Sequence, residues 1–268
     1  MIPFLPRPRL LACLAIALGT GAVLRSVLTP VPIGRVIDAQ TALEAQVQSE
    51  WQAHGDPADF SAEELQTLQR RFGVHGPQTP LAQLFTNGVD QFEPLRSLTL
   101  TRLQELKPVI LRQSKQHHIN PMLLTGILYD ELQHSKPGEG LPFVAHSGLI
   151  STHGPAQLGI SELIHQGRLP AEPSQEEIAQ ARDLLLDPSE NVALLAGKLS
   201  RLKRALHLPY TTMLNASASY ADAKAIATLA YLHNGKLDYP ARILRYMQDP
   251  ALHGLIYSTQ VDSAQRAI

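Results

Sequence analysis

A helix with one apolar face is predicted from the segment Asn120-Pro-Met-Leu-Leu-Thr-Gly-Ile-Leu-Tyr-Asp-Glu-Leu-Gln-His134, which carries a carboxylate among leucines. Asn120 is a preferred N-cap residue, and Pro121 suits the first helical position, where its missing N–H costs nothing. At about 100° per residue, one narrow face of this helix carries Leu124, Ile127, Leu128 and Glu131. Its other faces carry Thr125, Asp130 and Gln133.

The position of Glu131 on the face of the core leucines predicts a raised pKa for its carboxyl. Desolvation disfavours the ionised form, and the negative end of the helix dipole lies close by and adds to the effect. A carboxyl that keeps its proton near neutral pH is what a general acid needs. The alternative is a glutamate at the edge of the apolar face, whose head reaches water and performs no chemistry.

The composition around this segment indicates a helical, globular protein. The chain has 268 residues, of which 44% are hydrophobic and 18% charged, enough for one or two domains with a real core. Ala, Leu and Gln are abundant and aromatic residues are scarce, which favours helix. The net charge is −1 and no run of Lys and Arg occurs, so nucleic acid is not an expected partner.

The N-terminus has the pattern of a signal peptide. Arg7 and Arg9 precede an apolar run over residues 10–24, and Arg25 ends it. That run is short for a membrane span, and Thr20-Gly-Ala22 is an acceptable cleavage site. The alternative is an uncleaved anchor, with the positive flank left in the cytoplasm. In both cases the bulk of the protein is expected to be periplasmic or at the cell surface, with the membrane contacted only through this segment.

No metal site or cofactor is expected. The single cysteine, Cys13, lies inside the apolar N-terminal run, so the exported part has no thiol for a disulfide, a metal or a nucleophile. His117 and His118 are adjacent and cannot both face one site on a helix. His146 and His153 share a loop without Asp or Glu at ligand spacing. Phosphate-binding and dinucleotide-binding motifs do not occur in the sequence.

Caps, turns and apolar periodicity predict a succession of helices with few strands. Helices are expected at 36–54, from Ser61 to about Gly73, at 98–118, after Asn120, after Ser174, from Asp187 to about Leu206, at 221–233 and at 239–247. A loop or short hairpin is expected over 135–152, followed by a turn that leads into a short helix at 154–165.

Three short motifs follow Glu131 in order. They are Ser151-Thr-His-Gly-Pro-Ala-Gln-Leu-Gly-Ile160, Leu185-Leu-Asp-Pro-Ser-Glu-Asn191 and Leu229-Ala-Tyr-Leu-His-Asn-Gly235. This order resembles the lysozyme-like, lytic-transglycosylase superfamily, whose pattern is an acid ending a helix, a Gly-x-x-Gln turn, an Asp-x-x-x-Asn helix start and a Tyr-Asn-Gly-type cap. The resemblance covers roughly residues 95–250.

The resemblance assigns roles to the matching residues. The matches are Glu131 with the general acid, Gly154 to Gln157 with the turn that lines the sugar cleft, Asp187 and Asn191 with the helix start, and Asn234-Gly235 with the cap. Two positions depart from the pattern, because Leu132 replaces the serine that usually follows the acid and His233 replaces the tyrosine before the asparagine. Tyr231 lies two residues earlier.

On this resemblance we expect a lysozyme-like helical domain at 94–250, with a signal or anchor and linker at 1–34, a helical region at 35–93 and a C-terminal tail at 251–268. Its predicted substrate-binding residues are Ser151, His153, Gly154, Gln157, Tyr231 and Asn234. Gln157 offers a donor and an acceptor to an N-acetyl sugar, and Gly154 allows close backbone approach. The alternatives are a Gln157 tied to its own turn and an Asn234 that only caps a helix.

Glycosidases usually pair two carboxylates, and here the second is missing from the motifs. Glu139 is the nearby candidate, and its glycine neighbours favour a solvated loop residue. We therefore expect substrate-assisted cleavage of the glycan strands of peptidoglycan, in which Glu131 acts first as acid and then as base. The resemblance implies a 1,6-anhydro product. The alternatives are a catalytically weak module that binds glycan or a wall protein, and a helical spacer.

Overall fold

The described part of the chain is mainly α-helical. The computed structural model describes residues 41–42, 45–46, 49, 53–73, 93–135, 142–147 and 150–258. The chain divides into the units Met1–Gln46 and Val47–Ile268. In the first unit the four described residues are helical. The second unit contains the helices α3 (Ala62–Phe72), α5 (Glu93–His117), α6 (Pro121–Gln133), α7 (Pro142–His146), α8 (Ile160–His165), α9 (Gln175–Leu186), α10 (Pro188–Ala205), α11 (Tyr220–Asn234), α12 (Tyr239–Tyr246) and α13 (Pro250–Tyr257). Its two-stranded antiparallel sheet joins β1 (Thr152–His153) to β2 (Leu158–Gly159).

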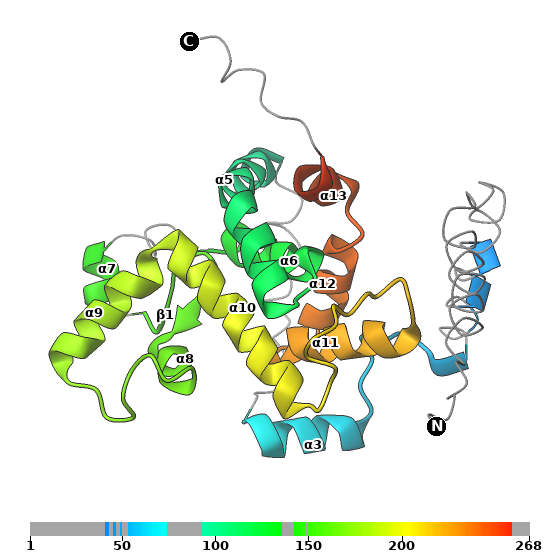
Figure 1. Cartoon of the computed structure of the whole chain (residues 1–268), viewed down its shortest axis with the longest axis horizontal. Coiled ribbons are helices and arrows are strands. Elements are labelled where there is room, and N and C mark those ends of the chain that lie inside the picture. Colours follow the sequence, from blue (N-terminus) through cyan, green and yellow to red (C-terminus); the bar gives the residue numbers. More distant parts are fainter. Residues whose placement is uncertain are drawn as a thin grey trace, which may run out of the picture. The chain divides into compact units, whose positions relative to one another are not determined.

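Helix α6 lies at the centre of the second unit and packs against α5, α10, α12 and α13 (Figure 1). Every residue from Met122 to Gln133 except Glu131 is buried. The prediction that one narrow face of α6 meets the core is therefore wrong, because all its faces do. The polar side chains on the other faces find partners inside: Thr125 donates to the Pro121 carbonyl at 2.8 Å, and Gln133 accepts from the Thr99 hydroxyl at 2.8 Å.

The helix starts predicted from capping residues are confirmed. The Asn120 side chain accepts from the Met122 N–H, and Pro121 occupies the first turn of α6. Ser61 and Ser174 form reciprocal capping boxes at the starts of α3 and α9. Asp187 caps α10 through the Glu190 N–H, and Val192, Leu195, Leu199 and Leu202 of that helix are buried. Local hydrogen-bond chemistry therefore fixes these four helix starts.

Two segments differ from the prediction. The hairpin lies over 152–159, later than expected, and the region before it contains α7. The tail predicted from residue 251 begins later, because α13 packs Leu252 and Ile256 into the core. The start of α13 repeats a signal used elsewhere in the chain: Asp249 is an N-cap and Pro250 occupies the first turn.

The predicted signal segment with Cys13, and the Glu139 loop, lie outside the described residues. Among the helices that are described, none has both the length and the hydropathy of a membrane span.

Candidate functional site

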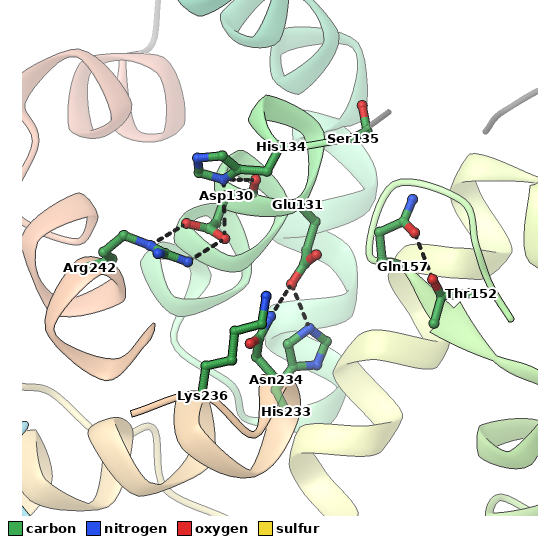
Figure 2. A pocket seen from close by; sticks show the side chains of 10 residues that line it. All are labelled: Asp130, Glu131, His134, Ser135, Thr152, Gln157, His233, Asn234, Lys236 and Arg242. Carbon is green, nitrogen blue, oxygen red and sulfur yellow. Dashed lines mark hydrogen bonds and ion pairs between the residues drawn. The ribbon is translucent and has the colours of Figure 1, made fainter. Parts of the chain in front are cut away.

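A polar pocket of about 320 Å³ opens beside the last turn of α6 (Figure 2). Residues from α6, the hairpin and the α11–α12 connection line it: Asp130, Glu131, His134, Ser135, Thr152, Gln157, His233, Asn234, Lys236 and Arg242. Its volume lies within the range of small-molecule sites. The single residue of α6 after Pro121 that is not buried, Glu131, is among these residues.

Three donors meet one oxygen of the Glu131 carboxyl. The Tyr239 hydroxyl donates to Oε1 at 2.9 Å, the Asn234 amide lies 3.3 Å from it, and His233 Nε2 lies 3.4 Å from it. Figure 2 shows the His233 and Asn234 contacts ending on the same oxygen. Among the described residues no hydrogen bond goes to Oε2. The described residues therefore hold the carboxyl through Oε1 and leave Oε2 without a hydrogen bond.

The end of α11 brings these donors together. Gly235 follows the helix with φ of 80°, and its N–H bonds to the Tyr231 carbonyl. This left-handed cap, predicted from Asn234-Gly235, ends the helix beside Glu131 and turns the chain into α12. Tyr239 is the first residue of α12 and is fully buried, so its hydroxyl is fixed against the carboxyl.

The surroundings set the protonation of Glu131 and His233. Burial raises the pKa of the Glu131 carboxyl, but the hydrogen bond and charge of His233, with the Tyr239 and Asn234 donors, outweigh it and lower the pKa. Burial, and then the nearby Lys198 ammonium, lower the pKa of His233. At neutral pH the pair is thus an ionised Glu131 and a neutral His233. The raised pKa predicted for Glu131 is wrong for the free protein, because the sequence did not place these donors.

The His233 pKa predicts how stability depends on pH. The folded pKa lies below the ordinary value of 6.5, so below that pH the unfolded chain takes up a proton that the folded chain does not. We expect the free energy of unfolding to fall as the pH drops from 7 to 5. His233→Gln, which keeps a donor but cannot titrate, should show a smaller fall. Chemical denaturation at several pH values measures both slopes, and equal slopes would contradict the assignment.

Asp130 is not a free second carboxylate. It is 2% exposed, and Arg242 donates to both its oxygens, from Nε at 2.9 Å and Nη2 at 3.2 Å. Arg242 Nη1 donates to Asp238 at 2.6 Å, and His134 Nδ1 lies 3.4 Å from Asp130 Oδ2. Figure 2 shows this pair beside Glu131. Because Arg242 bonds to both oxygens of Asp130, this ion pair forms part of the pocket wall, and the Asp130 carboxylate is not free to act on a substrate.

Asn191 fastens the hairpin to the start of α10. Its side chain is fully buried, accepts from the Ala156 N–H at 2.7 Å, and donates to the carbonyls of His153 at 3.0 Å and Leu185 at 2.9 Å. Gly154 has φ of 74°, and a Cβ there would overlap the Leu185 carbonyl and the Asn191 amide. The glycine is therefore needed for close packing in the hairpin.

The predicted substrate-binding residues have different positions. Gln157 and Asn234 line the pocket with Glu131, whereas Ser151 and Gly154 do not. Gln157 accepts from the Thr152 hydroxyl at 2.8 Å and donates to the Gly154 carbonyl at 3.3 Å, as the alternative for this residue predicted. His153 is 1% exposed and Tyr231 is 0% exposed, packed against Phe60. Core packing covers both side chains, and neither lines the pocket.

Sequence reasoning missed Tyr239, Lys236 and the Asp130–Arg242 pair. None belongs to a motif, and Tyr239 lies 108 residues from Glu131 along the chain. The nearest sequence signal for Lys236 and Tyr239 is the Asn234-Gly235 cap, because such a cap turns the chain and brings the residues that follow it close to the end of the helix.

Within the described ranges, no cluster of three or more His, Cys, Asp or Glu side chains could hold a metal ion. No family model, curated protein or solved structure matches the chain.

Proposed function

We propose that this protein is a lysozyme-like enzyme that cleaves the glycan strands of peptidoglycan, with Glu131 as its single acid and base. The observation that carries the proposal is the carboxyl of Glu131. This carboxyl lies in the wall of a polar pocket, and three donors hold it through Oε1. Its Oε2 accepts no hydrogen bond from the described residues. A fixed carboxyl with one uncommitted oxygen has the geometry for proton transfer to a glycosidic oxygen.

The rest of the pocket supports an N-acetyl sugar as ligand. The Asn234 Nδ2 group contacts Glu131, and its Oδ1 is buried without a hydrogen-bond partner among the described residues. An acetamido N–H would satisfy that acceptor. With Asp130 closed by Arg242, cleavage would use the substrate's own C6 hydroxyl or acetamido oxygen as nucleophile. Glu131 would give its proton to the leaving oxygen and, on the C6 route, then take one from the attacking hydroxyl.

With Glu131 as the acid, cleavage should be faster at acidic pH than at neutral pH. The pair of Glu131 and His233 must hold one proton, and both groups have lowered pKa values in the free protein. A sugar that covers Oε2 adds desolvation, which raises the Glu131 pKa in the complex. We expect kcat/KM to rise as the pH falls below 6.5, and His233→Gln to move the basic limb of the profile to lower pH. A rate that is constant or increases from pH 6.5 to 8 would contradict the pairing.

The direct test is to incubate the purified protein with peptidoglycan and to analyse released fragments by mass. Fragments with 1,6-anhydro ends support the transglycosylase route, and fragments with reducing ends support hydrolysis by the same acid. Absence of fragments across pH 4 to 8 would overturn the proposed enzyme.

A second candidate is a glycan-binding module with little activity. It is favoured by the lowered pKa of Glu131, which leaves the carboxyl ionised and a poor acid at neutral pH. Sedimentation of the protein with insoluble peptidoglycan, without fragment release at any pH, would favour this module over the enzyme.

A further inference from the structure

Most polar side chains that line the pocket already have partners. Asp130 and Arg242 neutralise each other, and Thr152 bonds to Gln157. His233 and Asn234 are engaged with Glu131. A ligand in the pocket therefore meets few uncommitted charges.

Lys236 is the exception. It lines the pocket, it lies two residues after Asn234 in the connection between α11 and α12, and its side chain is partly exposed. No ion pair or hydrogen bond joins its ammonium to another side chain in the part of the chain that the structure describes. Figure 2 shows it beside Asn234 and Glu131 without a dashed line. Its ammonium carries three N–H donors, and no residue that the structure describes accepts a hydrogen bond from them.

We propose that Lys236 forms an anion subsite that recognises a carboxylate on the sugar bound next to Glu131, namely the free lactyl carboxylate of N-acetylmuramic acid. The inference rests on the proposed function and specifies its substrate. A strand of alternating N-acetylglucosamine and N-acetylmuramic acid carries its sugar-attached carboxyls on the lactyl groups. These are anionic where the peptide is absent and are neutral amides where it is present.

An ammonium and a carboxylate form a charge-assisted hydrogen bond, which is stronger than one to an amide oxygen. The Glu131 carboxylate repels an anion at neutral pH, so a cation in the same pocket is needed for such a substrate to enter. The preferred substrate is then a strand stripped of its peptides. A reaction that hydrolyses the amide bond between lactyl group and peptide must supply it.

The test uses three tetrasaccharides of alternating N-acetylglucosamine and N-acetylmuramic acid. One has free lactyl carboxylates, one has the same groups as methylamides, and one carries L-alanine in amide linkage, which moves the carboxylate outward. Cleavage rates are measured for the wild-type chain, Lys236→Met and Lys236→Arg. Lys115→Met removes the same charge from an exposed position of α5 outside the pocket lining and serves as the matched control.

We expect the wild type to prefer the free carboxylate over the methylamide by about tenfold in kcat/KM, the scale of one charge-assisted bond. Lys236→Met should abolish this preference by slowing cleavage of the free carboxylate more than cleavage of the methylamide, and Lys236→Arg and Lys115→Met should retain it. Equal rates on the two substrates in the wild type, or an equal loss on both in Lys236→Met, would overturn the subsite. A preference for the L-alanyl substrate would overturn its assignment to the lactyl group.

Binding separates this inference from the proposed function. Titration calorimetry of Glu131→Gln and of Glu131→Gln with Lys236→Met compares the same ligands without turnover. Selective binding of the carboxylate form that disappears with Lys236→Met supports the subsite even if the wild type cleaves nothing, a result that would overturn the enzyme alone. Absence of binding, or binding without selectivity, overturns the subsite.

Discussion

Replacing Glu131 by Gln should reduce glycan cleavage by about 10³-fold or more, which is the upper range for loss of a general acid. The amide keeps the size of the side chain and an oxygen that can accept from Tyr239, Asn234 and His233. The NH2 group that replaces Oε2 can donate a hydrogen bond but is too weak an acid to protonate the leaving oxygen. The measurement is the initial rate of fragment release from peptidoglycan at the acidic optimum.

The fold should tolerate this change. The amide keeps an acceptor oxygen for the same donors, so the free energy of unfolding should change by no more than about 1 kcal/mol. Glu105→Gln, at an exposed position of α5, provides the matched control and should keep full activity. Retention of more than about a tenth of the activity by Glu131→Gln would remove the glutamate from the proton-transfer step.

Replacing Asn191 by Ala should destabilise the protein by about 3 kcal/mol or more, because buried polar groups that lose their partners cost about 1 to 3 kcal/mol each. The Ala156 N–H and the His153 and Leu185 carbonyls would all lose the Asn191 side chain. Chemical denaturation measures the loss. The hairpin that carries Gln157 would also lose its attachment to α10, so ligand affinity should fall with stability.

Asn215→Ala is a suitable comparison, because Asn215 is exposed and its hydrogen bonds to Ser217 are local. Its cost should stay below about 1 kcal/mol, since water replaces the lost partner. If Asn191→Ala lowered the free energy of unfolding no more than Asn215→Ala, the hairpin would have other sources of stability. The role of Asn191 in holding the pocket wall would then be disproved.

Part of the site was predictable from particular residues. Glu131, Gln157 and Asn234, separated widely along the chain, were predicted to share one site, and all three line the pocket. The helix starts at Asn120, Ser174 and Asp187 were also predictable, because an N-cap bonds to a residue two or three positions away.

The misplaced residues share a physical cause. His153 and Tyr231 sit in the predicted motifs, but burial depends on which element covers a side chain, as Phe60 covers Tyr231. The same limit applies to Thr125, Asp130 and Gln133, which were placed away from the core leucines and are nevertheless buried. Asp130 and Gln133 have partners on other helices, and Thr125 bonds to the Pro121 carbonyl of its own helix.

The amino-acid order alone was sufficient for the helical class, for the caps and for the choice of Glu131 as the residue of interest, because these follow from interactions within a few positions. The protonation of Glu131 followed from packing alone. Asn234 lies 103 residues away and Tyr239 lies 108 residues away, and together with His233 they reverse the effect of burial on the carboxyl. A pKa reflects the charges and donors that surround a group in space, and these are assembled when distant helices pack.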